Sequence, residues 1–270
     1  MALRWYISQD KAYAEKAIEI LNAWSFTLDS ITHDNRKWHI GTGGIKFLNA
    51  AEIIKHTYKG WKKKDQQAFE DMILKVWFPV IEPFQPNFNG NAAIMQTMMS
   101  IGIFTDRQDI FDRAYNHCLN GESLGAIGNY DNEAGQCQES GRNQNHAQLG
   151  LGFMSAICET AWNQGLDLYG AYANRLALGF EYTAKYMIGE EVEYVPYKTF
   201  KGDIVFPDSI SSQGRGRFSP VYERGFRHYH DRMGLEMPYT KLAMEKSTPE
   251  RSGGSLIPWS TLMNHGYPSK

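Results

Sequence analysis

The chain has few cysteines, and their spacing excludes two common uses of this residue. Cys118, Cys137 and Cys158 are the three cysteines among 270 residues, and no two of them have the CxxC spacing of a zinc ribbon. An odd number without a repeated spacing also argues against a disulfide framework. We therefore expect buried free thiols.

Long apolar runs and an excess of one charge are also lacking. No window reaches the roughly 18 uninterrupted apolar residues that a membrane-spanning helix needs. The 28 Lys and Arg nearly balance the 30 Asp and Glu, so the formal net charge is only −2. Without a basic field we expect neither nucleic acid nor a membrane as a partner. The first residues lack a secretory signal pattern, so either the protein is cytoplasmic or a leader precedes this chain.

Apolar and aromatic residues, by contrast, are plentiful. Apolar residues make up 42% of the chain, enough for a sizeable core in one large domain or two small ones. Aromatic residues make up 13%, which exceeds the need of a core and suits a cleft that stacks on flat or sugar-like ligands.

The spacing of apolar residues predicts an all-α protein. Apolar residues recur every three or four positions in most segments, which is typical of amphipathic helices. Helices are predicted over 10–28, 45–61, 66–80, 92–104, 108–118, 144–162 and 169–187. Gly- and Asn-rich segments at 41–44 and 87–91 predict turns between antiparallel helical hairpins. The segment 190–217 is too long for an ordinary connection, so we expect a functional loop or lid there. No linker divides the chain, which favours a single domain over 1–270.

The densest polar segment is 135–146, and it directly precedes the apolar stripe of a predicted helix. One interpretation is an elaborate helix N-terminus with Ser140 or Asn143 as the cap.

The other interpretation is a functional patch. Glu139 and His146 are seven residues apart with Arg142 between them, so they would share a face if a helix spans both. His146 titrates near neutrality, Glu139 could orient it, and Arg142 could pair with an anionic ligand. No second His or Cys lies at ligand spacing, so we expect no metal.

A second cluster contains two arginines and a tyrosine. Arg215 and Arg217 flank a glycine and could form a fork for a carboxylate or phosphate. Tyr222 lies near the first turn of a helix predicted from about Pro220, and nearby positive charge would make it a usable base. The alternative is a solvated basic turn with a core tyrosine.

Two further segments could bind a sugar. Asn89-Gly90-Asn91 is a turn by composition, and its amides could recognise a carboxylate or hydroxyl. The segment 161–169 contains Trp162 and ends a helix at Gly165, the expected C-cap. It suits a sugar platform, although helix packing explains it as well.

Three runs of sequence resemble a known family. They are GQCQESGRNQNH at 135–146, AWNQGLDLY at 161–169 and EYTAKY at 181–186. They are similar to the alginate lyase superfamily of polysaccharide lyases, and the closest resemblance is to polysaccharide lyase family 38, whose members cleave alginate or β-1,4-glucuronan. The segment 43–52 and Asn89-Gly90-Asn91 fit the same pattern.

This resemblance implies an incomplete α/α toroid of antiparallel helical hairpins with one long irregular loop. Compared with the family, the chain looks short at its N-terminus. It implies secretion or export to the periplasm, an acidic polysaccharide as the substrate, and β-elimination without a metal or other cofactor. The residues it implies as catalytic are Tyr222, His146, Glu139, and Arg215 or Arg217. The residues expected to bind the substrate are Asn91, Asn89, Arg142, Asn143, Gln138, Trp162 and Trp38. The segment 197–214 is longer than the resemblance leads us to expect, so the choice between Arg215 and Arg217 stays open. A second departure is Ala92, at a position where many relatives in the wider superfamily carry Trp.

The chemistry needs these residue types. The C5 proton of a uronate is weakly acidic while the neighbouring carboxylate stays charged, so neutralising that charge is the largest task. We expect His146, Asn91 and an arginine to do so, with Glu139 sharing a proton with the substrate or fixing the histidine tautomer. Tyr222 would serve as base and acid if proton and leaving group lie on one face, as in mannuronate. If the proton and the leaving group lie on opposite faces, as in guluronate, His146 would be the base and Tyr222 the acid.

Two other function classes stay open at this point. A glycoside hydrolase would need a second carboxylate opposite Glu139, for which Asp131, Glu133 and Asp167 are unconvincing partners. A non-catalytic protein could bind acidic glycans through Trp38, Trp162 and surface tyrosines. The sequence leaves the oligomeric state undetermined.

Overall fold

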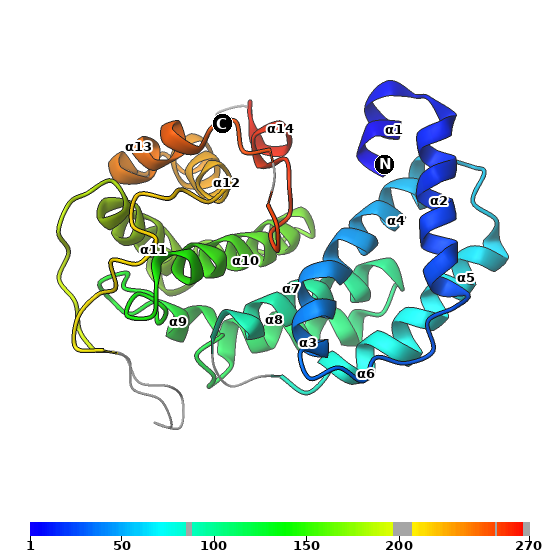
Figure 1. Cartoon of the computed structure of the whole chain (residues 1–270), viewed down its shortest axis with the longest axis horizontal. Helices are drawn as coiled ribbons and strands as arrows, with labels where there is room; N and C mark the ends of the chain where they lie inside the picture. The colour runs from blue at the N-terminus through cyan, green and yellow to red at the C-terminus, as the bar shows by residue number, and fades with distance from the viewer. Residues whose placement is uncertain (85–87, 197–206, 252, 267–270) are drawn as a thin grey trace. The chain divides into compact units, whose positions relative to one another are not determined.

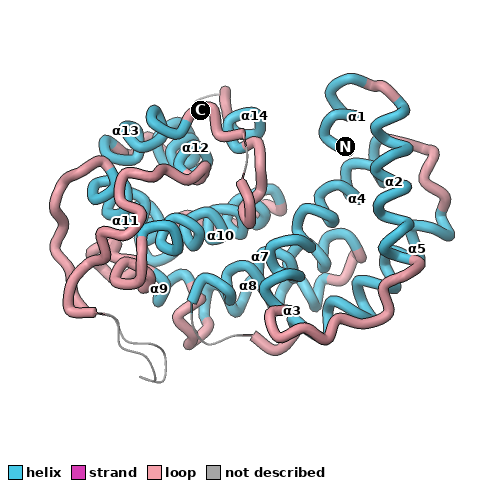
Figure 2. The backbone as a smooth tube through the Cα atoms, in the orientation of Figure 1, coloured by secondary structure: helices cyan, strands magenta, loops and turns pink. Residues whose placement is uncertain are grey.

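The computed structural model describes residues 1–84, 88–196, 207–251 and 253–266, and it confirms an all-α protein (Figures 1 and 2). Over these ranges the helices are joined by loops, and the β-pairing found is one bridge between Asp131 and Cys137. None of the helices in this part of the chain combines the length and apolar character needed to cross a bilayer. The three cysteines are buried and free, as the sequence predicts.

The chain divides into two compact units. Unit 1 takes residues from Met1–Phe84 and Ile94–Ala114, and unit 2 takes the described residues from Gln85–Ala93 and Tyr115–Lys270. The chain passes between the units three times, after residues 84, 93 and 114. The second and third of these boundaries fall inside helices, α7 (Phe88–Phe104) and α8 (Gln108–Asn120). The single domain over 1–270 stays a prediction.

Unit 1 contains most of the predicted N-terminal helices. Its remaining elements are α1 (Ala2–Ser8), α2 (Lys11–Ser25), α3 (Arg36–His39), η1 (Ile40–Gly44), α4 (Ile45–Thr57), α5 (Lys63–Met72), η2 (Ile73–Trp77) and α6 (Phe78–Ile81). The Asp10 side chain caps α2 by accepting the backbone N–H of Ala12 at 3.0 Å. In the core, the Phe69 ring packs edge-on against Trp61 and Trp77.

The turn predicted at 41–44 is wrong, because these residues form the π-helical turn η1 between α3 and α4. The glycine content serves close packing: a Cβ on Gly44 would lie only 2.8 Å from Thr97 Cγ2. The carbonyl of Gly41 accepts hydrogen bonds from Gln96 Nε2 at 2.9 Å and Thr97 Oγ1 at 2.8 Å. Side chains of α7 thus bind the backbone of the π-helical turn.

The turn predicted at 87–91 is also wrong where the structure describes it. Residue 87 lies outside the described residues, and Phe88–Asn91 form the first turn of α7. The helix can begin at this Asn-rich run because a distant carboxylate binds one of its first N–H groups: Asn89 N donates to Glu139 Oε1 at 3.3 Å.

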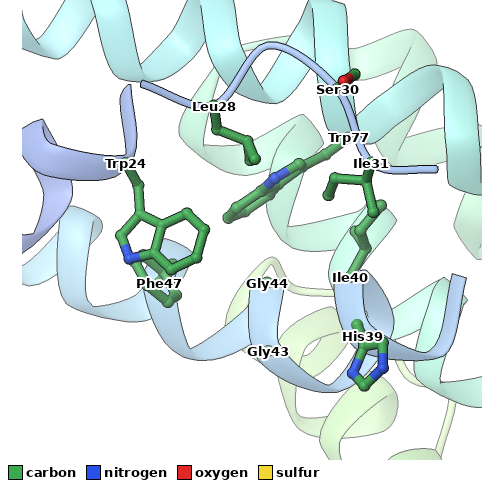
Figure 3. A pocket seen from close by; sticks show the side chains of 10 residues that line it. All are labelled: Trp24, Leu28, Ser30, Ile31, His39, Ile40, Gly43, Gly44, Phe47 and Trp77. Carbon is green, nitrogen blue, oxygen red and sulfur yellow. The ribbon is translucent and has the colours of Figure 1, made fainter. Parts of the chain in front are cut away.

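A pocket of about 360 Å³ lies within unit 1 (Figure 3). Its walls are mainly apolar, with Trp24 and Trp77 on two sides, and the backbone of Gly43 and Gly44 forms part of its lining. The other lining residues are Leu28, Ser30, Ile31, His39, Ile40 and Phe47.

Unit 2 is organised around one long buried helix. Its elements are α9 (Ile127–Tyr130), α10 (Gln144–Asn163), α11 (Ala171–Met187), α12 (Tyr222–Phe226), η3 (Arg227–Arg232), α13 (Pro238–Ser247) and α14 (Ser260–Asn264). Helix α10 contacts α11 and α12, and most of its residues are buried. It ends as predicted near Gly165, which has a φ of 80°, and the N–H of Leu166 turns back to the carbonyl of Ala161 at 3.0 Å.

The helix predicted over 169–187 is regular only in its later part. Tyr172, Ala173 and Asn174 have left-handed backbone angles, so the right-handed helix follows them. The Tyr172 hydroxyl donates to the carbonyl of Leu119 at 2.9 Å, a tertiary contact that anchors the irregular turn.

The loop predicted over 190–217 is confirmed for its described residues, and 197–206 lie outside them. The Gln136 amide donates to the carbonyl of Val195 at 2.6 Å and accepts its N–H at 2.8 Å. The N–H of Ser211 donates to the carbonyl of Ser140 at 3.0 Å. Both described parts of the loop are therefore bound to the polar segment 135–146.

Candidate functional site

Glu139 and His146 are brought together by α7 rather than by a common helix. The helix that would place them on one face does not exist, because α10 begins at Gln144. Asn89 on the first turn of α7 instead contacts both: its N–H donates to Glu139 Oε1 at 3.3 Å, and its Nδ2 donates to the carbonyl of His146 at 3.2 Å. We call Asn89, Glu139, Arg142, Asn143 and His146 the Glu139–His146 network; all five lie in unit 2.

The Glu139 carboxylate is the buried anchor of this network. Its side chain is 0% exposed and pairs with Arg142 Nη1 at 3.4 Å. Burial raises the pKa of Glu139, while the charge of Arg142 and the N–H of Asn89 oppose that shift. The Arg142 side chain is 42% exposed, so a cation that is held from behind by Glu139 is presented to solvent.

His146 lies half-buried in the first turn of α10. Asn143 is the N-cap of this helix, and its Oδ1 accepts the backbone N–H of His146 at 3.0 Å. The same oxygen lies 2.8 Å from Nδ1 of the imidazole. Burial and the charge of Arg142 lower the pKa of His146, so the imidazole is neutral at physiological pH.

Asn91 and Gln138 point toward a neighbouring loop. Asn91 Nδ2 lies 3.1 Å from His117 Nε2 and 2.9 Å from Ser123 Oγ, and Gln138 Nε2 donates to the carbonyl of Leu124 at 2.7 Å. Both side chains are buried and hold the loop that follows α8. Their contact with a substrate stays a prediction.

Tyr222 begins α12, close to the predicted helix start, and its side chain is completely buried. Its hydroxyl donates to Gln148 Oε1 at 3.1 Å, and its backbone N–H donates to Glu250 Oε1 at 2.9 Å. Burial raises the pKa of Tyr222 well above its ordinary value. Within the described ranges, neither Glu139 nor His146 makes a hydrogen bond to this tyrosine.

The two predicted arginines lie in different surroundings. The Arg215 guanidinium donates to the carbonyls of Tyr186 and Glu190 and pairs with Glu191 at 3.0 Å. It thereby caps the C-terminal end of α11. Arg217 has an exposed side chain, and its carbonyl accepts Gln148 Nε2 at 3.0 Å.

The two predicted tryptophans lie in different units. Trp162 in the last turn of α10 packs edge-on against His228, with ring centroids 4.8 Å apart, and Arg232 lies over its ring. This arrangement is the helix packing that the sequence left as an alternative to a sugar platform. Trp38 is half-buried on α3 of unit 1.

Two buried polar residues were missed by sequence reasoning. Gln148 binds Tyr222, Ser219 and the carbonyl of Arg217, and its signal was a polar residue four positions after Gln144 inside an apolar stripe. Glu250 binds two N–H groups at the start of α12, and its local sequence carries no such signal.

No cluster of three or more His, Cys, Asp or Glu side chains suited to a metal ion occurs in the part of the chain that the structure describes.

Comparison with known proteins identifies the family. The family model described as alginate lyase matches residues 1–193, which is well over half of the chain. The chain belongs to the alginate lyase family. It is therefore a polysaccharide lyase, and membership of this family implies alginate as the substrate. The matched range of this lyase includes the whole Glu139–His146 network and ends before Arg215 and Tyr222. Neither the curated proteins nor the solved structures gave a match to the chain.

Proposed function

We propose that this lyase cleaves mannuronate-rich alginate by metal-independent β-elimination at the Glu139–His146 network. The observation that carries the proposal is a neutral, half-buried imidazole next to a partly exposed guanidinium. His146 can accept a proton because its pKa is lowered. Arg142 can bind the uronate carboxylate because 42% of its side chain is exposed.

Charge neutralisation is the first task of the site. Removing the C5 proton places more negative charge on the neighbouring carboxylate, so a fixed cation there lowers the barrier. Arg142 supplies this cation, and Glu139 holds its guanidinium from the buried side at 3.4 Å. The Glu139 side chain is 0% exposed, so the sharing of its proton with the substrate, which the sequence suggests, stays a prediction.

Proton transfer is the second task, and we assign it to His146. The imidazole removes the C5 proton, the C5–H electron pair forms the C4–C5 double bond, and the C4–O4 bond breaks. The imidazolium then returns the proton to the departing O4, leaving a 4,5-unsaturated uronate end. One group can serve both steps when the C5 proton and O4 lie on the same face, as in mannuronate.

β-1,4-Glucuronan is the second candidate substrate, because glucuronate and mannuronate share the configuration at C4 and C5. In guluronate the proton and O4 lie on opposite faces, which requires a separate acid. The role of Tyr222 as base, which the resemblance implies, stays a prediction. Its burial and its bond to Gln148 favour His146 instead.

The resemblance of the three runs also supports finer assignments. We propose membership of polysaccharide lyase family 38 and an incomplete α/α toroid as the complete architecture. We also propose secretion or export to the periplasm, because a long polysaccharide cannot cross a membrane to reach an internal enzyme.

The test compares polymannuronate, polyguluronate and glucuronan as substrates, with ultraviolet absorbance of the unsaturated product as the readout. We expect the fastest cleavage with polymannuronate, and His146→Ala should lower turnover by about 10² to 10⁴. His56→Ala is the matched control, since His56 lies 61% exposed beside Glu52 on the surface of unit 1. Turnover of His146→Ala above about a tenth of the wild-type value would reject the assignment, as would a preference for polyguluronate.

A further inference from the structure

The side chain of Asn143 has two partners at the start of α10. Its Oδ1 accepts the backbone N–H of His146 at 3.0 Å, which is an ordinary N-cap bond. The same oxygen lies 2.8 Å from Nδ1 of the His146 imidazole. One atom therefore serves both the backbone and the imidazole of the same residue.

The backbone bond determines which end of the amide faces the ring. A backbone N–H can only donate, so the Asn143 atom that it contacts must be the oxygen and not the amide nitrogen. This removes the usual ambiguity between the two ends of an asparagine side chain. An oxygen without a hydrogen can only accept, so His146 Nδ1 must carry a proton. In the neutral imidazole the lone pair is then on Nε2.

We infer that Asn143 is a positioning residue that keeps the proton of neutral His146 on Nδ1 and leaves Nε2 free to act as the base. This inference rests on the proposed function of His146. It changes the expected role of Asn143 from substrate binding to control of the histidine tautomer. Asn89 also binds the backbone of His146, since its Nδ2 donates to the carbonyl of that residue at 3.2 Å.

The consequence for catalysis follows from the alternative tautomer. Without an acceptor beside Nδ1, a neutral imidazole in water places its proton mainly on Nε2. A proton on Nε2 would remove the lone pair from that nitrogen. Loss of the Asn143 acceptor should therefore lower kcat without a comparable change in KM, because the substrate contacts of Arg142 remain.

The experiment uses two substitutions that both retain a good N-cap residue. Asn143→Ser keeps an oxygen that can accept the backbone N–H, but its shorter side chain cannot also reach the imidazole. Asn143→Asp keeps the cap and the acceptor and adds a negative charge. The position of the proton is read by nitrogen NMR of the histidine rings, with the His146 signal assigned by its absence in His146→Ala.

For the wild type and Asn143→Asp we expect a proton on Nδ1, and for Asn143→Ser a shift of the proton to Nε2 with an unchanged thermal midpoint. In Asn143→Asp the added charge raises the pKa of His146, so the acidic limb of kcat/KM moves to higher pH. The fall in kcat should be larger in Asn143→Ser than in Asn143→Asp.

A wild-type proton on Nε2, or a proton that remains on Nδ1 in Asn143→Ser, would overturn the inference. These outcomes are separate from the test of function. If the NMR result is as expected but no polymer yields an unsaturated product, then the proposed function fails and the assignment of the tautomer stands.

Discussion

Replacing Tyr222 by phenylalanine separates the two possible bases. The substitution removes one hydroxyl from a completely buried ring that packs against Phe180 and Phe218. The ring volume is nearly conserved, so no large cavity forms. The lost bond is the one from the hydroxyl to Gln148 Oε1.

The cost in stability should be small because Gln148 keeps another donor. Its Oε1 still accepts the N–H of Ser219 at 2.7 Å, so no buried acceptor is left unpaired. Loss of one such hydrogen bond typically costs about 0.5–1.5 kcal/mol. If His146 transfers the proton, Tyr222→Phe should therefore lower the thermal midpoint slightly and reduce turnover by less than about tenfold.

The assay combines initial rates of unsaturated-product formation on polymannuronate with thermal unfolding of the same samples. A general base contributes about 10² to 10⁴ in rate, far more than the expected change. A hundredfold or greater loss of turnover in a stably folded Tyr222→Phe variant would refute our assignment. That result would indicate that Tyr222 is the base, as the family resemblance implies.

Two further predictions concern pH dependence and packing. Burial and the charge of Arg142 both lower the pKa of His146, so Arg142→Gln should raise that pKa and move the acidic limb of kcat/KM to higher pH. The control Arg142→Lys keeps the charge and should leave the limb in place. An acidic limb that stays in place or moves to lower pH in Arg142→Gln would contradict the proposed base. In the π-helical turn, Gly43→Ala should stabilise by up to about 1 kcal/mol, because a Cβ there meets no atom within 4 Å and alanine favours helix. Gly44→Ala should destabilise by about 1–3 kcal/mol, because its Cβ would lie 2.8 Å from a side chain of α7. Urea unfolding of the two variants measures both effects, and equal destabilisation would indicate that the glycines are needed for backbone freedom.

Local patterns predicted most helices, because the periodicity of an amphipathic helix is visible within a few turns of sequence. The failures at 41–44 and 87–91 have a common physical cause. Glycine and asparagine favour turns, but they also suit close approach and hydrogen bonding between helices. The deciding partners are distant in sequence: Gln96 is 55 residues from Gly41, and Glu139 is 50 residues from Asn89.

The candidate site was predictable where its contacts are local. The cap at Asn143 and the pairing of Glu139 with Arg142 each span only a few residues, so the sequence could indicate them. The cluster of Arg215 and Tyr222 was different. Arg215 binds the carbonyl of Tyr186, 29 residues earlier, and no spacing rule within the cluster could reveal that partner.

The side-chain amide oxygens of Asn143 and Gln148 make the same pair of contacts, but the consequences for the titratable partner differ. Each amide oxygen accepts one backbone N–H, from His146 and Ser219 respectively, and that bond fixes which end of the amide faces its second partner. Each oxygen also faces one titratable side chain, at 2.8 Å for the His146 imidazole and 3.1 Å for the Tyr222 hydroxyl. An imidazole that donates through Nδ1 keeps a lone pair on Nε2, whereas a phenol that donates its single proton must break that bond before it can act as a base. The contrast between these two amide contacts is a second argument for proton transfer by His146.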